Sequence, residues 1–168
     1  AGGAFIAWVD YRFDAQGDIF LQHVNNNGDI LLDSNGVALA QVNGKQITIN
    51  MCTDSLGGAF ITWQDNRGGV DDDIYGTHIS SDHLIVEPGS GVSIVTEGGN
   101  QNAKTIEYAG SNQAFIAWAD FREGANADIY GQRLNMDMSG LFETNGFPIA
   151  STSEQELKPR ATYVNNNI

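Results

Sequence analysis

A repeat of 55 residues constrains this chain more than any other feature. The motif Phe-Ile-x-Trp-x-Asp-x-Arg, followed after a short gap by Asp-Ile, occurs at residues 5–19, 60–74 and 115–129. A glycine recurs at the same spacing further downstream, at Gly36, Gly91 and Gly146. Three copies in unbroken register predict one domain built from three equivalent units. We place the units at residues 2–56, 57–111 and 112–166.

Each unit is predicted to contain four short strands separated by turn residues. In the third unit these strands fall at residues 114–120, 128–134, 146–152 and 160–165. Asn, Asp and Gly dominate the intervening loops. Along residues 4–9 both alternating faces are apolar, which predicts a sheet covered on both sides. Since 20 glycines and a charged content of only 17% also favour turns and strands, we expect an all-β fold with almost no helix.

Four antiparallel strands per unit, stacked face to face, are typical of the blades of a β-propeller. The residues AWxDxR followed by DIYxQ resemble the repeats of propellers in bacterial secreted and surface-associated proteins. The resemblance covers the whole chain and implies an extracellular or cell-surface location. It marks an architecture rather than an activity. A β-helix or a β-sandwich is the alternative fold.

The expected strand order leaves an incomplete blade at each end of the chain. The first unit supplies three outer strands, and a C-terminal strand at about residues 159–166 has no sheet of its own. Three blades are too few to close a ring. We therefore expect a homodimer that forms a six-bladed ring, in which each C-terminal strand completes the first blade of the other chain. The alternative is a fragment of one longer propeller.

The repeated charged residues are candidates for ligand binding on the turn face of such a ring. They are Asp10, Arg12, Asp18, Asp65, Arg67, Asp73, Asp120, Arg122 and Asp128. We interpret each trio as a structural turn clamp, in which two aspartates face each other across a hairpin and the arginine bridges them. Three tryptophans would fill the space between neighbouring blades, namely Trp8, Trp63 and Trp118. The alternative interpretation is a set of repeated shallow sites for sugars.

One loop departs from the repeat and is a weak candidate for a calcium site. Asp71 and Asp72 precede the repeated Asp73, and the other two units lack both extra carboxylates. Calcium requires several oxygen ligands, which a loop of Asp and Gly can supply. The run lacks the twelve-residue EF-hand pattern, so a solvated acidic turn is the alternative.

Charge and cysteine content exclude several classes of partner and site. With 8 basic and 21 acidic residues the net charge is −13, which disfavours nucleic acids and anionic membrane surfaces. No apolar stretch approaches the length that a membrane-spanning helix needs. Cys52 is the single cysteine, so no intramolecular disulfide can form.

These observations favour a non-enzymatic module for binding or assembly. We expect no catalytic residues, a glycan or a protein as ligand, a second copy of the chain as partner, and no cofactor other than calcium. Identical residues in every unit argue against catalysis, because an active site is normally one asymmetric constellation. The alternative is a carbohydrate-active enzyme, similar to a glycosidase, with a pocket at the central channel.

Overall fold

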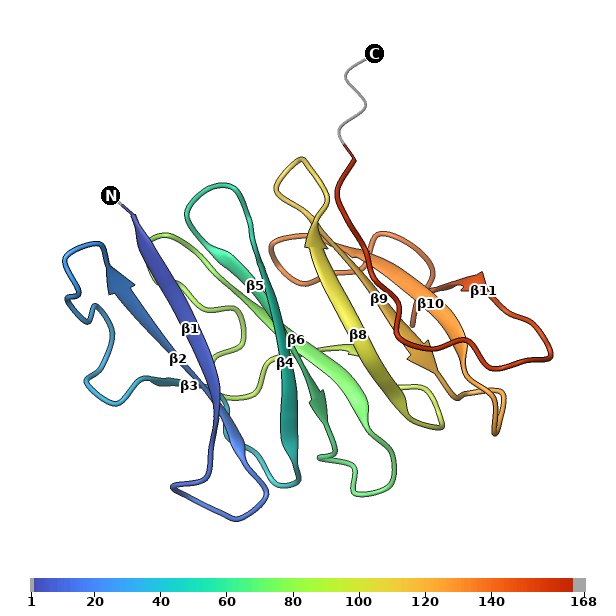
Figure 1. Cartoon of the computed structure of the whole chain (residues 1–168). Helices are drawn as coiled ribbons and strands as arrows, with labels where there is room; N and C mark the ends of the chain where they lie inside the picture. Colours follow the sequence, from blue (N-terminus) through green and yellow to red (C-terminus); the bar gives the residue numbers. More distant parts are fainter. Residues whose placement is uncertain (1, 165–168) are drawn as a thin grey trace.

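The computed structural model describes residues 2–164, apart from the side chain of Ala103. Within this range the chain forms eleven β-strands and no helix, which confirms the expected all-β class. The strands make three antiparallel sheets, which we number 1 to 3 along the chain. Figure 1 shows the three sheets side by side in chain order.

In each sheet the strands lie side by side in the order of the chain. Sheet 1 contains β1 (Gly3–Asp10), β2 (Asp18–Asn25) and β3 (Val37–Ala40). Sheet 2 contains β4 (Gln46–Thr53), β5 (Ala59–Asp65), β6 (Asp73–Ile79) and β7 (Val92–Val95). Sheet 3 contains β8 (Gln101–Tyr108), β9 (Ala114–Asp120), β10 (Asp128–Leu134) and β11 (Phe147–Ala150).

In sheets 2 and 3 the strand that precedes the motif-bearing strand forms one edge of the sheet. In sheets 2 and 3 the motif-bearing strands, β5 and β9, pair with β4 and β8 on one side. Sheet 1 has only three strands within the described residues, and β1 forms its edge. The units at residues 2–56 and 57–111 each contain four strands, as predicted, whereas the unit at residues 112–166 contains three within the described residues.

The repeat is copied into backbone details as well as into strand order. The first motif aspartate faces the second across each hairpin, in the pairs Asp10–Asp18, Asp65–Asp73 and Asp120–Asp128. A register shift interrupts the pairing of the next two strands at the same position in all three sheets, at residues 19/20, 74/75 and 129/130. A second bulge recurs in β4 and β8. Equivalent sequence thus produces equivalent local structure.

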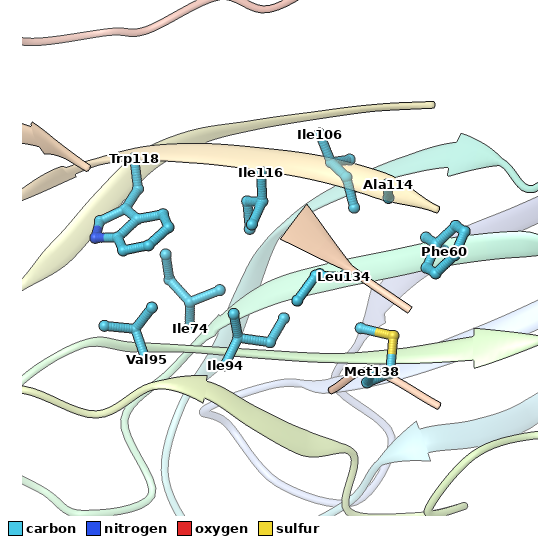
Figure 2. Packing of buried hydrophobic residues seen from close by; sticks show 10 residues of the cluster. All are labelled: Phe60, Ile74, Ile94, Val95, Ile106, Ala114, Ile116, Trp118, Leu134 and Met138. Carbon is cyan, nitrogen blue, oxygen red and sulfur yellow. The ribbon is translucent and has the colours of Figure 1, made fainter. Parts of the chain in front are cut away.

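The core consists of two apolar layers, one in each space between neighbouring sheets. Between sheets 1 and 2 the buried residues include Leu21, Ile61 and Trp63. Between sheets 2 and 3 they include Phe60 and Trp118, and Figure 2 shows this second layer with ten of its side chains. A sheet in the middle of the stack is therefore covered on both faces, as the apolar character of both faces of the motif strand predicts.

The last described segment, residues 151–164, has no strand assignment. The strand predicted at about residues 159–166 is therefore absent over residues 159–164 of this chain, and residues 165 and 166 lie outside the described range. A strand needs a partner for its backbone groups, and in the described residues no strand forms a hydrogen-bonded ladder with this segment. In Figure 1 it is the red segment that runs back across sheet 3.

Candidate functional site

The second unit shows the geometry of the repeated charged cluster. The Asp65 carboxylate is fully buried and accepts hydrogen bonds from the indole nitrogen of Trp63 at 2.9 Å and from the backbone of Arg67 at 2.9 Å. Arg67 also donates from Nε at 2.9 Å and forms an ion pair through Nη2 at 2.6 Å. The same Nη2 reaches the carbonyl of Ser90 at 2.7 Å, and the guanidinium lies over the ring of Tyr75.

The first and third units reproduce this cluster. The tryptophan donates to the first aspartate at 2.8 Å in unit 1 and at 2.7 Å in unit 3. The arginine Nη2 contacts the same carboxylate at 2.7 Å and 2.6 Å and a loop carbonyl at 2.9 Å and 2.8 Å, in units 1 and 3 respectively. The loop carbonyls belong to Asn35 and Asn145, one repeat before and one repeat after Ser90.

The prediction that the arginine bridges the two aspartates of a trio is wrong, because the arginine contacts the first aspartate and not the second. Arg12 contacts Asp10 but hydrogen-bonds to the carbonyl of Asn35, whereas Asp18 has a buried oxygen, Oδ2, without a partner in the described residues. The guanidinium turns away from the hairpin because the loop before β3 offers a carbonyl oxygen and an aromatic ring lies on the same side. The clamp therefore ties β1 to that loop.

The recurring glycine belongs to this cluster, although sequence analysis left its role open. Gly91 has a φ of 67°, and a Cβ at this position would lie 2.4 Å from the ring of Trp63. Gly36 and Gly146 meet Trp8 and Trp118 in the same way. Glycine is required here because the loop passes directly over the indole in a left-handed conformation.

In the first two units, hydrogen bonds and burial shift the pKa values of the motif aspartates. Hydrogen bonds from Arg12 hold the pKa of the Asp10 carboxyl well below its usual value. Burial, reinforced by the neighbouring carboxylates of Asp65 and Asp71, raises the pKa of Asp73 to about 6. Burial and nearby carboxylates also raise the pKa of Asp18. In the first unit, Asp18 therefore retains a proton at a pH where Asp10 does not.

These clusters have little capacity for chemistry. Both carboxylate oxygens of Asp65 already accept hydrogen bonds, and a nucleophile or general base needs a lone pair directed at a substrate. Nη2 of each arginine is likewise directed at protein oxygens. The geometry is that of a structural tie between a strand, a hairpin and a loop.

The loop of three aspartates also contacts the protein itself. Lys45 Nζ lies 3.1 Å from Asp72 Oδ1, and the backbone of Gly99 donates to Asp71 Oδ2 at 3.1 Å. Across the described part of the chain, no three His, Cys, Asp or Glu side chains are placed to hold a metal ion together. Calcium binding by Asp71, Asp72 and Asp73 stays a prediction.

Two histidine contacts were missed by sequence reasoning. His78 Nε2 lies 2.9 Å from Asp54 Oδ2 in a buried pair. Burial opposes ionisation of Asp54, but hydrogen bonds from His78 and two backbone N–H groups outweigh it and lower the pKa. His23 Nδ1 and His83 Nε2 lie 2.7 Å apart between sheet 1 and a loop of sheet 2. Neither contact follows from the repeat, because Asp54 and His83 have no equivalents in the other units.

Two further groups have shifted pKa values and poor access. Burial raises the pKa of the Cys52 thiol to about 12, so the thiolate that acts as a nucleophile is scarce at neutral pH. Lys104 is buried beside the bulge of β8, and burial lowers its pKa to about 7. Its ammonium donates to the carbonyl of Thr48 in the neighbouring sheet.

A broad, open hollow lies between the start of β1, the end of β2 and the end of β4. It has a volume of about 910 Å³, and its lining includes Gly3 and Phe5 of β1 and Met51 and Cys52 of β4. In sheet 2 the residue equivalent to Phe5 is Phe60, which pairs with Cys52 and is fully buried. Phe5 has no such partner strand in the described residues and lines the hollow instead.

Comparison with known proteins assigns no family. No protein-family model matches the chain, and no curated protein matches it significantly. In the described residues there is no helix long and apolar enough to cross a membrane.

Proposed function

We propose that this chain is a non-enzymatic β-propeller module for assembly and binding, and that two copies form a six-bladed ring. The observation that carries the proposal is a pair of matched open faces at the two ends of the stack. Ile6 on sheet 1 is 44% exposed, whereas its equivalents Ile61 and Ile116 are fully buried. The open face of sheet 1 thus has the composition of a face that is covered elsewhere.

Sheet 3 carries the complementary face at the other end of the stack. Ile149 of β11 is 49% exposed, whereas its equivalents are 9% exposed in sheet 2 and fully buried in sheet 1, at Ile94 and Leu39. Within the chain, Leu39 of sheet 1 packs in the layer that covers Ile61 of sheet 2. Sheet 3 of one copy would cover Ile6 of another by the same contact. Two such head-to-tail contacts close a twofold ring.

The turn face is the proposed surface for a glycan or protein ligand. Tyr11 and Phe13, in the hairpin loop of sheet 1, are each 61% exposed. Exposed aromatic rings beside charged groups are typical of recognition surfaces. The nine candidate Asp and Arg residues contribute mainly by holding this loop and its two equivalents in place.

A carbohydrate-active enzyme remains the second proposal because of one observation. Asp73 has a pKa of about 6 and faces the buried Asp65, and a glycosidase uses two carboxyl groups of unequal pKa. Against this, Asp65 is saturated by Trp63 and Arg67.

Light scattering coupled to size exclusion tests the assembly. We expect a mass twice the 18.1 kDa of one chain for the native sequence and the single-chain mass for Ile6→Lys, which places a charge on the proposed contact. Leu84→Lys, on a 72% exposed leucine away from both open faces, is the matched control and should stay dimeric. A native chain with the mass of one copy would overturn the ring.

Assays on aryl glycosides and a binding panel of neutral oligosaccharides test the activity. We expect no turnover, and we expect Tyr11→Ala to lower the affinity for any glycan that the native chain binds. Turnover that disappears in a folded Asp73→Asn variant would establish the enzyme instead.

A further inference from the structure

The C-terminal segment, residues 156–164, already follows the path of an innermost strand. The backbone N–H of Glu156 donates to the carbonyl of Ala127 at 2.8 Å. The first residues of β8 and β4 make the equivalent bonds one repeat and two repeats earlier, from Gln101 to Asp72 and from Gln46 to Gly17 respectively. Residue 156 therefore stands where the innermost strand of a fourth sheet would begin.

The backbone conformation and packing of the segment support the same assignment. Lys158 has a φ of 58°, and Thr48, at the equivalent position in the bulge of β4, has a φ of 54°. Non-glycine residues rarely adopt this conformation, so its recurrence indicates the same bulge. The ring of Tyr163 lies 5.3 Å from that of Tyr108, at the equivalent position in β8, and Tyr108 in turn bonds to Ser55 of sheet 2.

A strand edge of matching structure is free at the other end of the stack. In the described residues β1 pairs only with β2, whereas β5 and β9 each have a neighbour on both sides. Phe5 of β1 and Met51 of β4 line the hollow near the start of β1. An unpaired edge of this length is a template for strand addition.

We propose that residues 156–164 of a second copy add to the free edge of β1 in one defined register. This inference rests on the six-bladed ring proposed above and names the contact that closes it. The register follows from the pairing of β4 with β5 and of β8 with β9. It places Glu156 opposite Asp10, Arg160 opposite Ala7, Ala161 opposite Ile6, Thr162 opposite Phe5 and Tyr163 opposite Ala4.

The occupant is a second copy because of where the segment lies in its own chain. Tyr163 packs on Tyr108 of sheet 3, at the opposite end of the stack from β1. When sheet 3 of the second copy covers the open face of sheet 1, the C-terminal segment of that copy also lies beside β1. Face contact and strand addition are thus two parts of one interface.

One residue in this register departs from its equivalents. β4 and β8 place Gln46 and Gln101 opposite the first motif aspartate, whereas the added segment places Glu156 there, opposite Asp10. Like charges directly opposite each other destabilise an antiparallel pair. Glu156 therefore weakens the interface, and Glu156→Gln should strengthen it.

Engineered disulfides test the register in the 168-residue chain with Cys52→Ala. Ile6→Cys with Ala161→Cys lies directly opposite and should give a covalent dimer under mild oxidation. Ala4→Cys with Ala161→Cys is offset by two residues and is the matched control, which should crosslink poorly.

The outcomes separate this inference from the ring itself. A dimer that crosslinks only through the first pair supports the register. A dimer that crosslinks equally through the control pair, or through neither, overturns the register and leaves the ring standing. A chain with the mass of one copy overturns both.

Charge neutralisation gives an independent test. Glu156→Gln should lower the dimer dissociation constant by about fivefold, from the loss of a cross-strand repulsion. Glu87→Gln, on an exposed loop of sheet 2, removes the same charge away from β1 and should change it little. Equal effects of the two variants would contradict pairing between Glu156 and Asp10 and point to net charge alone.

Discussion

At the scale of single residues, the clamps of the first two units differ in exposure rather than in bonding. Arg12 is 41% exposed and Arg67 is 22% exposed, although both contact an aspartate and a loop carbonyl. Burial strengthens a charge-assisted hydrogen bond and increases the cost of losing it. The same substitution should therefore have graded effects.

Arg67→Lys should lower the free energy of unfolding by about 2 kcal/mol, because lysine cannot donate to Asp65 and Ser90 together or stack on Tyr75. Arg12→Lys should cost less than half of this, because solvent screens the more exposed pair. Urea unfolding of both variants checks the order. An equal loss would show that burial does not control the strength of the clamp.

Asp73 should give stability a distinct pH dependence. Its pKa is raised to about 6 in the folded state, so the folded protein holds a proton that the unfolded chain releases above its ordinary value of 3.8. Stability is therefore expected to fall as pH rises from about 4 to about 6. Asp73→Asn should remove this slope and, after allowance for screening, add about 1 kcal/mol at pH 7.

Thermal unfolding between pH 4 and pH 8 measures the effect of Asp73→Asn. Asp82→Asn, on an exposed loop, is the control and should leave the slope unchanged. An unchanged slope in Asp73→Asn would place the responsible proton elsewhere.

At the scale of elements, loops and bulges hold the sheets together as much as strand pairing does. Gly91 brings the loop before β7 onto Trp63, and the bulge of β8 carries Lys104 to the carbonyl of Thr48. Both contacts join segments that are distant in sequence. Gly91 has a backbone conformation that few residues tolerate, and Lys104 is a buried charged residue. Both positions are therefore sensitive to substitution.

Gly91→Ala should cost about 3 kcal/mol or more, because the new methyl group meets both a left-handed backbone and the indole of Trp63. Gly89→Ala is the matched control, since Gly89 also has a positive φ but no atom near its would-be Cβ. It should cost about 1 kcal/mol. The difference between the two variants, measured by urea unfolding, isolates the packing contribution.

Lys104 should give a slope of the opposite sign to that of Asp73. Burial lowers its pKa to about 7, so between about pH 7 and pH 10 the unfolded chain binds more protons and stability rises with pH. Lys104→Met should abolish this rise and stabilise the protein by about 1 to 2 kcal/mol at pH 7. Unfolding curves at pH 7 and about pH 9.5 check the sign, and a slope retained in Lys104→Met would contradict it.

At the scale of the whole molecule, the stack is closed in its middle and open at its ends. Sheet 2 is covered on both faces and its motif strand is buried throughout, whereas Asp10 is the one buried residue of β1. Apolar residues that are buried in one sheet and exposed in its equivalent indicate an interface. The assembly proposed above covers both ends.

Stability should accordingly depend on protein concentration. For a dimer that unfolds to separate chains, a hundredfold rise in concentration stabilises the native state by roughly 2.7 kcal/mol per mole of dimer. Ile149→Lys, on the exposed face of β11, should remove this dependence and leave a folded single chain. Denaturation midpoints at two concentrations measure the effect, and coincident midpoints for the native chain would count against the dimer.

The sequence by itself determined the repeat, the pairing of Asp10 with Asp18 and the strand positions, apart from the strand predicted at about residues 159–166. These features depend on neighbours close in the chain, so 55-residue copies of the same residues form the same hairpins. The tertiary structure decided the rest: the partner of Arg12 at Asn35, the buried pair of Asp54 and His78, and the exposure of Ile6. Each depends on what the fold brings alongside a residue, and equivalent residues at the end and in the middle of a stack have different neighbours.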